Sequence, residues 1–208
     1  MSFLAERVSN IKPSPTIAAT AKAAELRSSG LDVIGLGAGE PDFDTPDHIK
    51  VAAIEAINSG KTKYTAVDGI KELKEGISKK FKNDNQIEYS NKEITVGTGG
   101  KQVLYNALMA TLNKDDEVII PAPFWVSYPD MVVLADGSPV IAKCKEQDDF
   151  KITPEILEKS ITKKTKWLIL NSPSNPTGIG YEKNELLALS KVLEKYPDIL
   201  IMMDDMYE

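Results

Sequence analysis

Short apolar segments alternate with helical patterns through the second half of the chain. Their β-branched and aliphatic residues predict five β-strands, at Ile94 to Thr98, Val118 to Ile120, Pro139 to Cys144, Trp167 to Asn171 and Ile199 to Met203. Helices are predicted between them, over Lys101 to Leu112, Val126 to Ala135, Pro154 to Ile161 and Glu182 to Tyr196. Alternation of this kind implies right-handed crossovers between parallel strands. The sequence therefore predicts an α/β fold with a mostly parallel sheet sandwiched by helices.

The first ninety residues follow a less regular pattern. Ser14 and Pro15 start a helix that Gly30 ends, and Thr45 with Pro46 starts a second that ends before Gly60. A third helix is predicted over residues 70–81. Between the first two helices, a short strand leads into a glycine-rich loop.

Composition and charge exclude several classes of protein. Lysine and arginine number 25 against 31 aspartate and glutamate, a formal charge of −6, so we expect no nucleic-acid partner. The one cysteine, Cys144, cannot form an internal disulfide, and His48 lies outside any metal-binding spacing, so no metal is expected. No apolar run has the length of a membrane span or signal peptide. We expect a cytoplasmic protein without a membrane partner.

The loops that follow the strands carry the candidate chemistry, because open parallel sheets bind ligands beyond the carboxyl ends of their strands. Gly99, Gly100 and Lys101 precede a helix, whose N-terminal N–H groups favour an anion such as phosphate. Neither a Walker loop nor a dinucleotide fingerprint fits these residues. The alternative is that the two glycines only permit a tight turn.

Three further loops add groups suited to a heterocycle. Trp125 could stack on a planar ring or be a core indole, and Asn175 could be a fixed hydrogen-bond donor or an ordinary turn residue. A cis peptide is possible before Pro176. Asp204 follows an apolar strand, where an unpaired carboxylate is costly, and no basic residue lies nearby in sequence. A protonated ring nitrogen would suit it, with Tyr207 as a second donor. Together these groups predict a site for pyridoxal phosphate.

Several motifs are similar to those of the class I, fold-type I pyridoxal-phosphate-dependent aminotransferases. Those motifs are Gly39-Glu40-Pro41-Asp42-Phe43, Lys63-Tyr64, Gly99-Gly100-Lys101, Asn171 to Gly178 and Asp204-Asp205-Met206-Tyr207. Two longer segments, Gly37 to Pro46 and Pro123 to Pro129, together with Lys12-Pro13-Ser14, resemble bacterial aspartate aminotransferases, including the type that accepts prephenate. The resemblance covers the whole chain.

The resemblance implies a cofactor role for most of these residues. Gly99, Gly100 and Lys101 would bind the cofactor phosphate through backbone N–H groups. Trp125 would stack on the pyridine ring, while Asp204 would keep the ring nitrogen protonated. Asn175 and Tyr207 would hydrogen-bond the phenolic oxygen, and Tyr64 would reach a phosphate across a homodimer interface.

Substrate contacts are implied as well. Gly39 would line the site of the substrate carboxylate, with Trp125 and Asn175 nearby, and Lys12 would contact the distal carboxylate of a dicarboxylic substrate. The implied reaction is transamination between L-aspartate, or a related dicarboxylic or aromatic amino acid, and a 2-oxo acid. Residues 1–45 would form an N-terminal arm and part of a small domain, and residues 46–208 a large cofactor-binding domain that lacks its C-terminal strands.

Two departures from the family pattern affect these expectations. The family usually has glutamate where Asp205 stands, a mild change beside the ring. In addition, the family's Schiff-base lysine and two anion-binding arginines would lie beyond Glu208, and Lys101 does not match the lysine motif. We therefore expect no catalytic residue within the chain, which would be an N-terminal part inactive by itself. The alternative is an inactive truncated or split-gene product of the same family.

Overall fold

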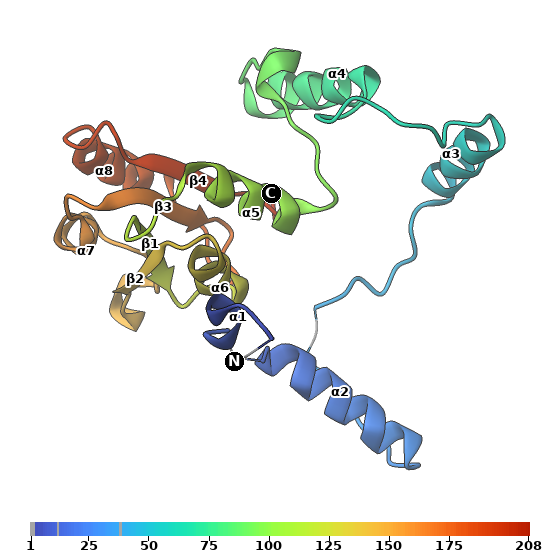
Figure 1. Ribbon diagram of the computed structural model, residues 1–208, viewed down its shortest axis with the longest axis horizontal. Helices are drawn as coiled ribbons and strands as arrows, with labels where there is room; N and C mark the ends of the chain where they lie inside the picture. The colour runs from blue at the N-terminus through green and yellow to red at the C-terminus, as the bar shows by residue number, and fades with distance from the viewer. Residues whose placement is uncertain (1–2, 12, 38) are drawn as a thin grey trace. The chain divides into compact units, whose positions relative to one another are not determined.

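The computed structural model describes residues 3–11, 13–37 and 39–208. The chain divides into two units, and Figure 1 labels their helices and strands. One unit is formed by residues 13–97, and the other by 98–208 together with the described residues of 1–12. Within the described residues, no helix combines the length and apolar character needed to cross a membrane.

The unit of residues 13–97 is helical. Its three α-helices, all predicted from the sequence, are α2 (Pro15–Ser28), α3 (Asp47–Asn58) and α4 (Lys71–Lys80), followed by the short helices η1 (Phe81–Asn85) and η2 (Asn91–Glu93). The Ser14 hydroxyl caps α2 by accepting a hydrogen bond from the Ile17 N–H. Neither α2 nor α3 buries a residue. In α4, the buried Lys74 donates a hydrogen bond to Asp68 and holds the pKa of that carboxyl below its usual value.

The other unit is built on a four-stranded parallel sheet. Its strands are β1 (Glu117–Ala122), β2 (Ser138–Lys143), β3 (Thr165–Asn171) and β4 (Leu200–Asp204), in the spatial order β2-β1-β3-β4. The helices of this unit are α1 (Glu6–Ser9), α5 (Gly100–Thr111), α6 (Ser127–Leu134), η3 (Glu146–Asp148), α7 (Pro154–Ser160) and α8 (Lys183–Leu193). The predicted parallel α/β arrangement is confirmed.

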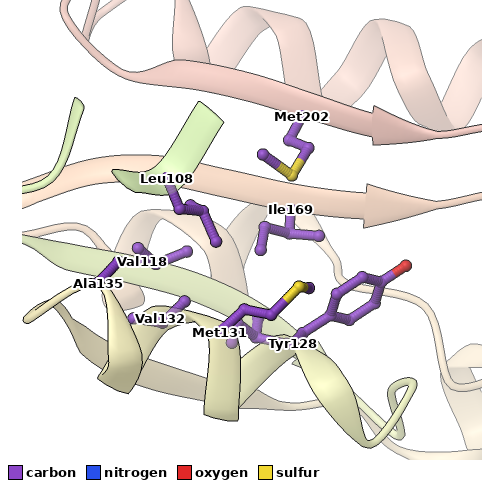
Figure 2. Close-up of a cluster of buried hydrophobic side chains, with 9 residues drawn as sticks. Leu108, Val118, Tyr128, Met131, Val132, Ala135, Ile169 and Met202 are labelled. Atoms are coloured by element: carbon purple, nitrogen blue, oxygen red, sulfur yellow. The ribbon is translucent and has the colours of Figure 1, made fainter. Parts of the chain in front are cut away.

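Two hydrophobic clusters cover opposite faces of the sheet, because successive strand residues point to opposite sides. On one face, Val118 and Ile169 pack against α5 and α6 (Figure 2). Ile120 belongs to the same cluster. On the other, Ile119, Leu168 and Leu170 pack against α7 and α8. The predicted sandwich of helices around the sheet is therefore correct.

The predicted strand at Ile94 to Thr98 is wrong. These residues are not part of the sheet, and the Val96 N–H donates instead to the Asp68 carbonyl at 3.0 Å. A strand requires a hydrogen-bonding neighbour, and among the described residues the four strands pair only with one another. The apolar residue Ile94 is nevertheless buried, so the apolar pattern of this segment reflects burial and not strand pairing.

The face covered by α7 allows a stability test. Leu157 is fully buried in the second cluster, so Leu157→Ala should lower the free energy of unfolding by about 2 to 5 kcal/mol. The control is Leu187→Ala on α8, where the side chain is 52% exposed and the expected change is within about 0.5 kcal/mol. Urea unfolding followed by circular dichroism measures both. Equal losses for the two variants would contradict the assigned core.

Candidate functional site

The carboxyl ends of β3 and β4 lie next to each other. In the register of this parallel pair, Asn171 at the end of β3 is opposite Asp204 at the end of β4. The loops that follow these strands therefore start side by side. This edge of the sheet is where the sequence predicted a ligand site.

Asn171 connects the two strand ends and the proline-rich loop. It is 9% exposed, and its Nδ2 donates to the Asp204 carbonyl at 2.7 Å. Its Oδ1 accepts a hydrogen bond from the Asn175 N–H, also at 2.7 Å. Both ends of one buried amide are thus satisfied, which fixes the loop against β4. The peptide bonds before Pro173 and Pro176 are cis, the second as considered from the sequence.

Asp204 has a partner that the sequence analysis missed. The Tyr128 hydroxyl, on α6, donates to the Asp204 Oδ2 at 2.5 Å. Tyr128 is only 2% exposed, and its burial, followed by the neighbouring carboxylate, raises the pKa of its phenol far above the usual value. Tyr128 is therefore a neutral donor. Among the described residues, no cation forms an ion pair with Asp204, whose negative charge remains uncompensated.

Asn175 and Tyr207 lie together beside these strand ends. The Asn175 Nδ2 donates to the Tyr207 hydroxyl at 3.2 Å. Asn175 is half-buried and Tyr207 is 50% exposed, so both can be reached from solvent. The two residues that the resemblance assigned to one ligand oxygen are thus neighbours.

The start of α5 presents backbone N–H groups. Gly99 precedes the helix with a φ of 85°, a conformation that strongly favours glycine. Among the described residues, no group accepts a hydrogen bond from the N–H of Gly99, Gly100 or Lys101. A Cβ atom at Gly100 would lie 3.6 Å from the Met206 Cε, which places this helix start near the segment after β4.

Trp125 lies between the core and the start of α5. Its half-buried indole packs against the first hydrophobic cluster and contacts the Tyr128 ring edge-on, with 5.3 Å between ring centroids. The Lys101 Nζ lies 4.8 Å from the centroid of the indole ring. The indole is therefore neither a fully buried core residue nor a surface residue, and its stacking on a ligand ring stays a prediction.

These groups fit pyridoxal phosphate chemically. N–H groups without acceptors suit its phosphate, an accessible indole suits its aromatic ring, and an uncompensated carboxylate suits a protonated ring nitrogen. The paired donors Asn175 and Tyr207 suit its phenolic oxygen. Seven predicted cofactor residues belong to the sheet-containing unit, where Lys101 contacts Trp125 and Asn175 bonds to Tyr207. They are Gly99, Gly100, Lys101, Trp125, Asn175, Asp204 and Tyr207.

The roles of three other predicted site residues are not tested by the structure. Tyr64 and Gly39 belong to the helical unit, where both are exposed, and their roles stay predictions. Lys12 lies outside the described residues. The described residues also contain no group of three or more His, Cys, Asp or Glu side chains that could bind a metal ion.

Comparison with known proteins gives one family. The model of the family described as aminotransferase class I and II matches residues 31–208. The aspartate/prephenate aminotransferase of Cereibacter sphaeroides is 62% identical over the whole chain, which covers 52% of that protein. The enzyme of the same name from Nitrosomonas europaea is 58% identical over 99% of the chain and 52% of its own length. The chain spans about half the length of these relatives.

Solved structures agree with the sequence relatives. The aspartate aminotransferase of Rhizobium meliloti superposes with a TM-score of 0.94 at 48% identity, over 99% of this chain and 51% of that one. The aspartate aminotransferase of Thermus thermophilus with maleate gives a TM-score of 0.95 at 45% identity, over 100% of this chain and 54% of that one. The fold is therefore that of these aminotransferases over about half of their length.

The role of Asn171 can be tested by amide hydrogen exchange. Asn171→Ala removes the acceptor of the Asn175 N–H, so exchange at Asn175 should accelerate by about tenfold or more, equivalent to about 1.4 kcal/mol. The control is Ser174→Ala in the same loop, because the Ser174 side chain makes no hydrogen bond among the described residues. Unchanged protection of Asn175 in the Asn171 variant would show that the amide does not hold the loop.

Proposed function

Because the chain belongs to the aminotransferase class I and II family, we propose that it carries half of the active site of a pyridoxal-phosphate-dependent enzyme. That enzyme transfers an amino group between L-aspartate, or a related dicarboxylic or aromatic amino acid, and a 2-oxo acid. Relatives named aspartate/prephenate aminotransferases support this substrate class. The observation that carries the proposal is the combination, in one unit, of the uncompensated Asp204 carboxylate and the unbonded N–H groups at the start of α5.

Each group of the cluster has a proposed task. The N–H groups of Gly99, Gly100 and Lys101 bind the cofactor phosphate at the positive end of the α5 dipole. The Trp125 indole supports the face of the cofactor ring, and Asn175 and Tyr207 orient the ring through its phenolic oxygen. When bound, pyridoxal phosphate supplies an electron sink for the carbon that loses its proton. Asp204 supports that sink by holding a proton on the ring nitrogen.

Other parts of the site are proposed from the resemblance. Gly39 and Lys12 contact the substrate carboxylates, and Tyr64 reaches a phosphate in the second subunit of a homodimer. Among the described residues of the cluster, Lys101 is the lysine nearest the ring-binding indole, but it stands at the phosphate-binding helix start. We propose that the lysine that bonds to the cofactor comes from outside residues 1–208, and that the enzyme acts in the cytoplasm.

A half-reaction tests the proposed function. The full-length protein loaded with pyridoxal phosphate should be converted to the pyridoxamine form by L-aspartate, with one oxaloacetate released per site. D-aspartate is the control. Release of ammonia or carbon dioxide without conversion of the cofactor would identify β-elimination or decarboxylation instead, and would contradict the proposal.

Asp204→Asn should greatly slow this half-reaction. Asparagine keeps the size of the side chain and removes its charge, so the single-turnover rate should fall by about 100-fold or more, equivalent to about 2.7 kcal/mol. Thermal unfolding should change little, because the side chain is only half-buried.

The matched control for this prediction is Asp205→Asn, which neutralises the adjacent exposed carboxylate. Its single-turnover rate should stay close to that of the parent protein. A rate of the Asp204 variant within about threefold of the parent would refute the role of Asp204.

A further inference from the structure

Tyr128 contacts two of the groups proposed to hold the cofactor. Its hydroxyl donates to the Asp204 carboxylate, and its ring packs edge-on against Trp125. We propose that Tyr128 is a positioning residue that fixes the Asp204 carboxylate in place for the ring nitrogen of the cofactor, an inference that rests on the proposed function. Tyr128 acts through Asp204 and has no assigned contact with the cofactor.

The surroundings of Tyr128 leave its hydroxyl little freedom. The ring belongs to the hydrophobic cluster formed by α5, α6 and the sheet, where it lies beside Met131 and Ile169 (Figure 2). Only 2% of the residue is exposed. A tyrosine ring has only two side-chain torsions, and burial in a packed core restricts both. The hydroxyl is therefore held at one point at the end of β4.

The hydroxyl occupies one carboxylate oxygen of Asp204 and leaves the charge unchanged. A lysine or arginine in this position would also hold Oδ2, but it would compensate the negative charge that attracts a protonated nitrogen. Tyr128 remains neutral, because burial and the adjacent carboxylate both disfavour its ionised form. A neutral donor thus orients the carboxylate and preserves its charge for a ligand.

The Asp204 residue is held from two directions. Tyr128 on α6 binds its side chain, and Asn171 on β3 binds its backbone carbonyl at 2.7 Å. Fixing both the carbonyl and the carboxylate leaves the side-chain torsions of Asp204 few alternatives. Preorganisation of this kind lowers the cost of aligning a charged group with its ligand.

The same helical turn also couples Asp204 to the stacking residue. The Tyr128 N–H donates to the Trp125 carbonyl at 3.1 Å, so the two residues belong to one hydrogen-bonded turn at the start of α6. Together with the edge-on contact between the two rings, this bond restricts how far the indole and the Tyr128 hydroxyl can move apart. This turn would set the position of the Asp204 carboxylate, which faces the cofactor nitrogen, relative to the Trp125 indole, which faces the cofactor ring.

The experiment compares Tyr128→Phe with Tyr181→Phe in the full-length protein. Phenylalanine at position 128 keeps the ring contact with Trp125 and removes only the hydroxyl. Tyr181 is a matched control, because it is another tyrosine shielded in this unit, with its pKa raised to about 12 by burial, and its hydroxyl bonds to the Ile152 N–H. The probe is pyridoxamine 5'-phosphate labelled with ¹⁵N in the ring, which binds without a covalent bond to the protein.

Two readouts are measured, the dissociation constant of the probe and the ¹⁵N chemical shift of its bound ring nitrogen. Tyr128→Phe should weaken binding by about tenfold, equivalent to about 1.4 kcal/mol, and should move the nitrogen signal toward that of the unprotonated ring. Tyr181→Phe should leave the nitrogen signal unchanged. A general loss of packing would affect stability in both variants but would not change ring protonation.

The outcomes separate this inference from the proposed function. If the parent protein binds the probe but Tyr128→Phe binds within twofold of it, or leaves the nitrogen signal unchanged, the positioning role is overturned. The role is also overturned if both variants move the signal equally. If the parent protein does not bind the probe at all, the proposed function itself fails.

Discussion

The site depends on one constraint, which is that all four strands of the sheet run in the same direction. Their carboxyl ends must then lie along a single edge of the sheet. Asn171 at the end of β3 and Asp204 at the end of β4 therefore become neighbours, although they are 33 positions apart in the sequence. The hydrophobic clusters on the two faces fix the strands, and the strands in turn fix Asn171 opposite Asp204. The positions of the strand ends are therefore set by buried aliphatic residues on both faces of the sheet.

The charge of Asp204 is the second determinant. A carboxylate placed at the end of an apolar strand costs stability unless donors or a cation accompany it. The structure supplies the neutral donor Tyr128 on the carboxylate and the Asn171 amide on the carbonyl, without an ion pair among the described residues. These hydrogen bonds offset part of the cost of placing the Asp204 carboxylate at the end of β4. The charge of the carboxylate stays available to a cationic group of a ligand.

Local patterns in the sequence were sufficient to predict most elements and the residues of the cluster. Strands β1 to β4 and the helices between them follow from short apolar runs that alternate with helical patterns. Partners distant in sequence could not be predicted in this way. The pair formed by Tyr128 and Asp204 is 76 residues apart, and the strand expected at Ile94 to Thr98 failed because pairing depends on a neighbouring strand.

Two groups at the proposed site would favour a ligand energetically. The unbonded N–H groups at the start of α5 and the uncompensated Asp204 carboxylate are solvated or unpaired in the protein alone, and each represents interaction energy that folding does not use. A molecule that carries a phosphate and a protonated ring nitrogen would satisfy both groups at once. Because a ligand that binds the folded state stabilises it by mass action, a cofactor bound at the proposed site would couple folding of the protein to occupancy of that site.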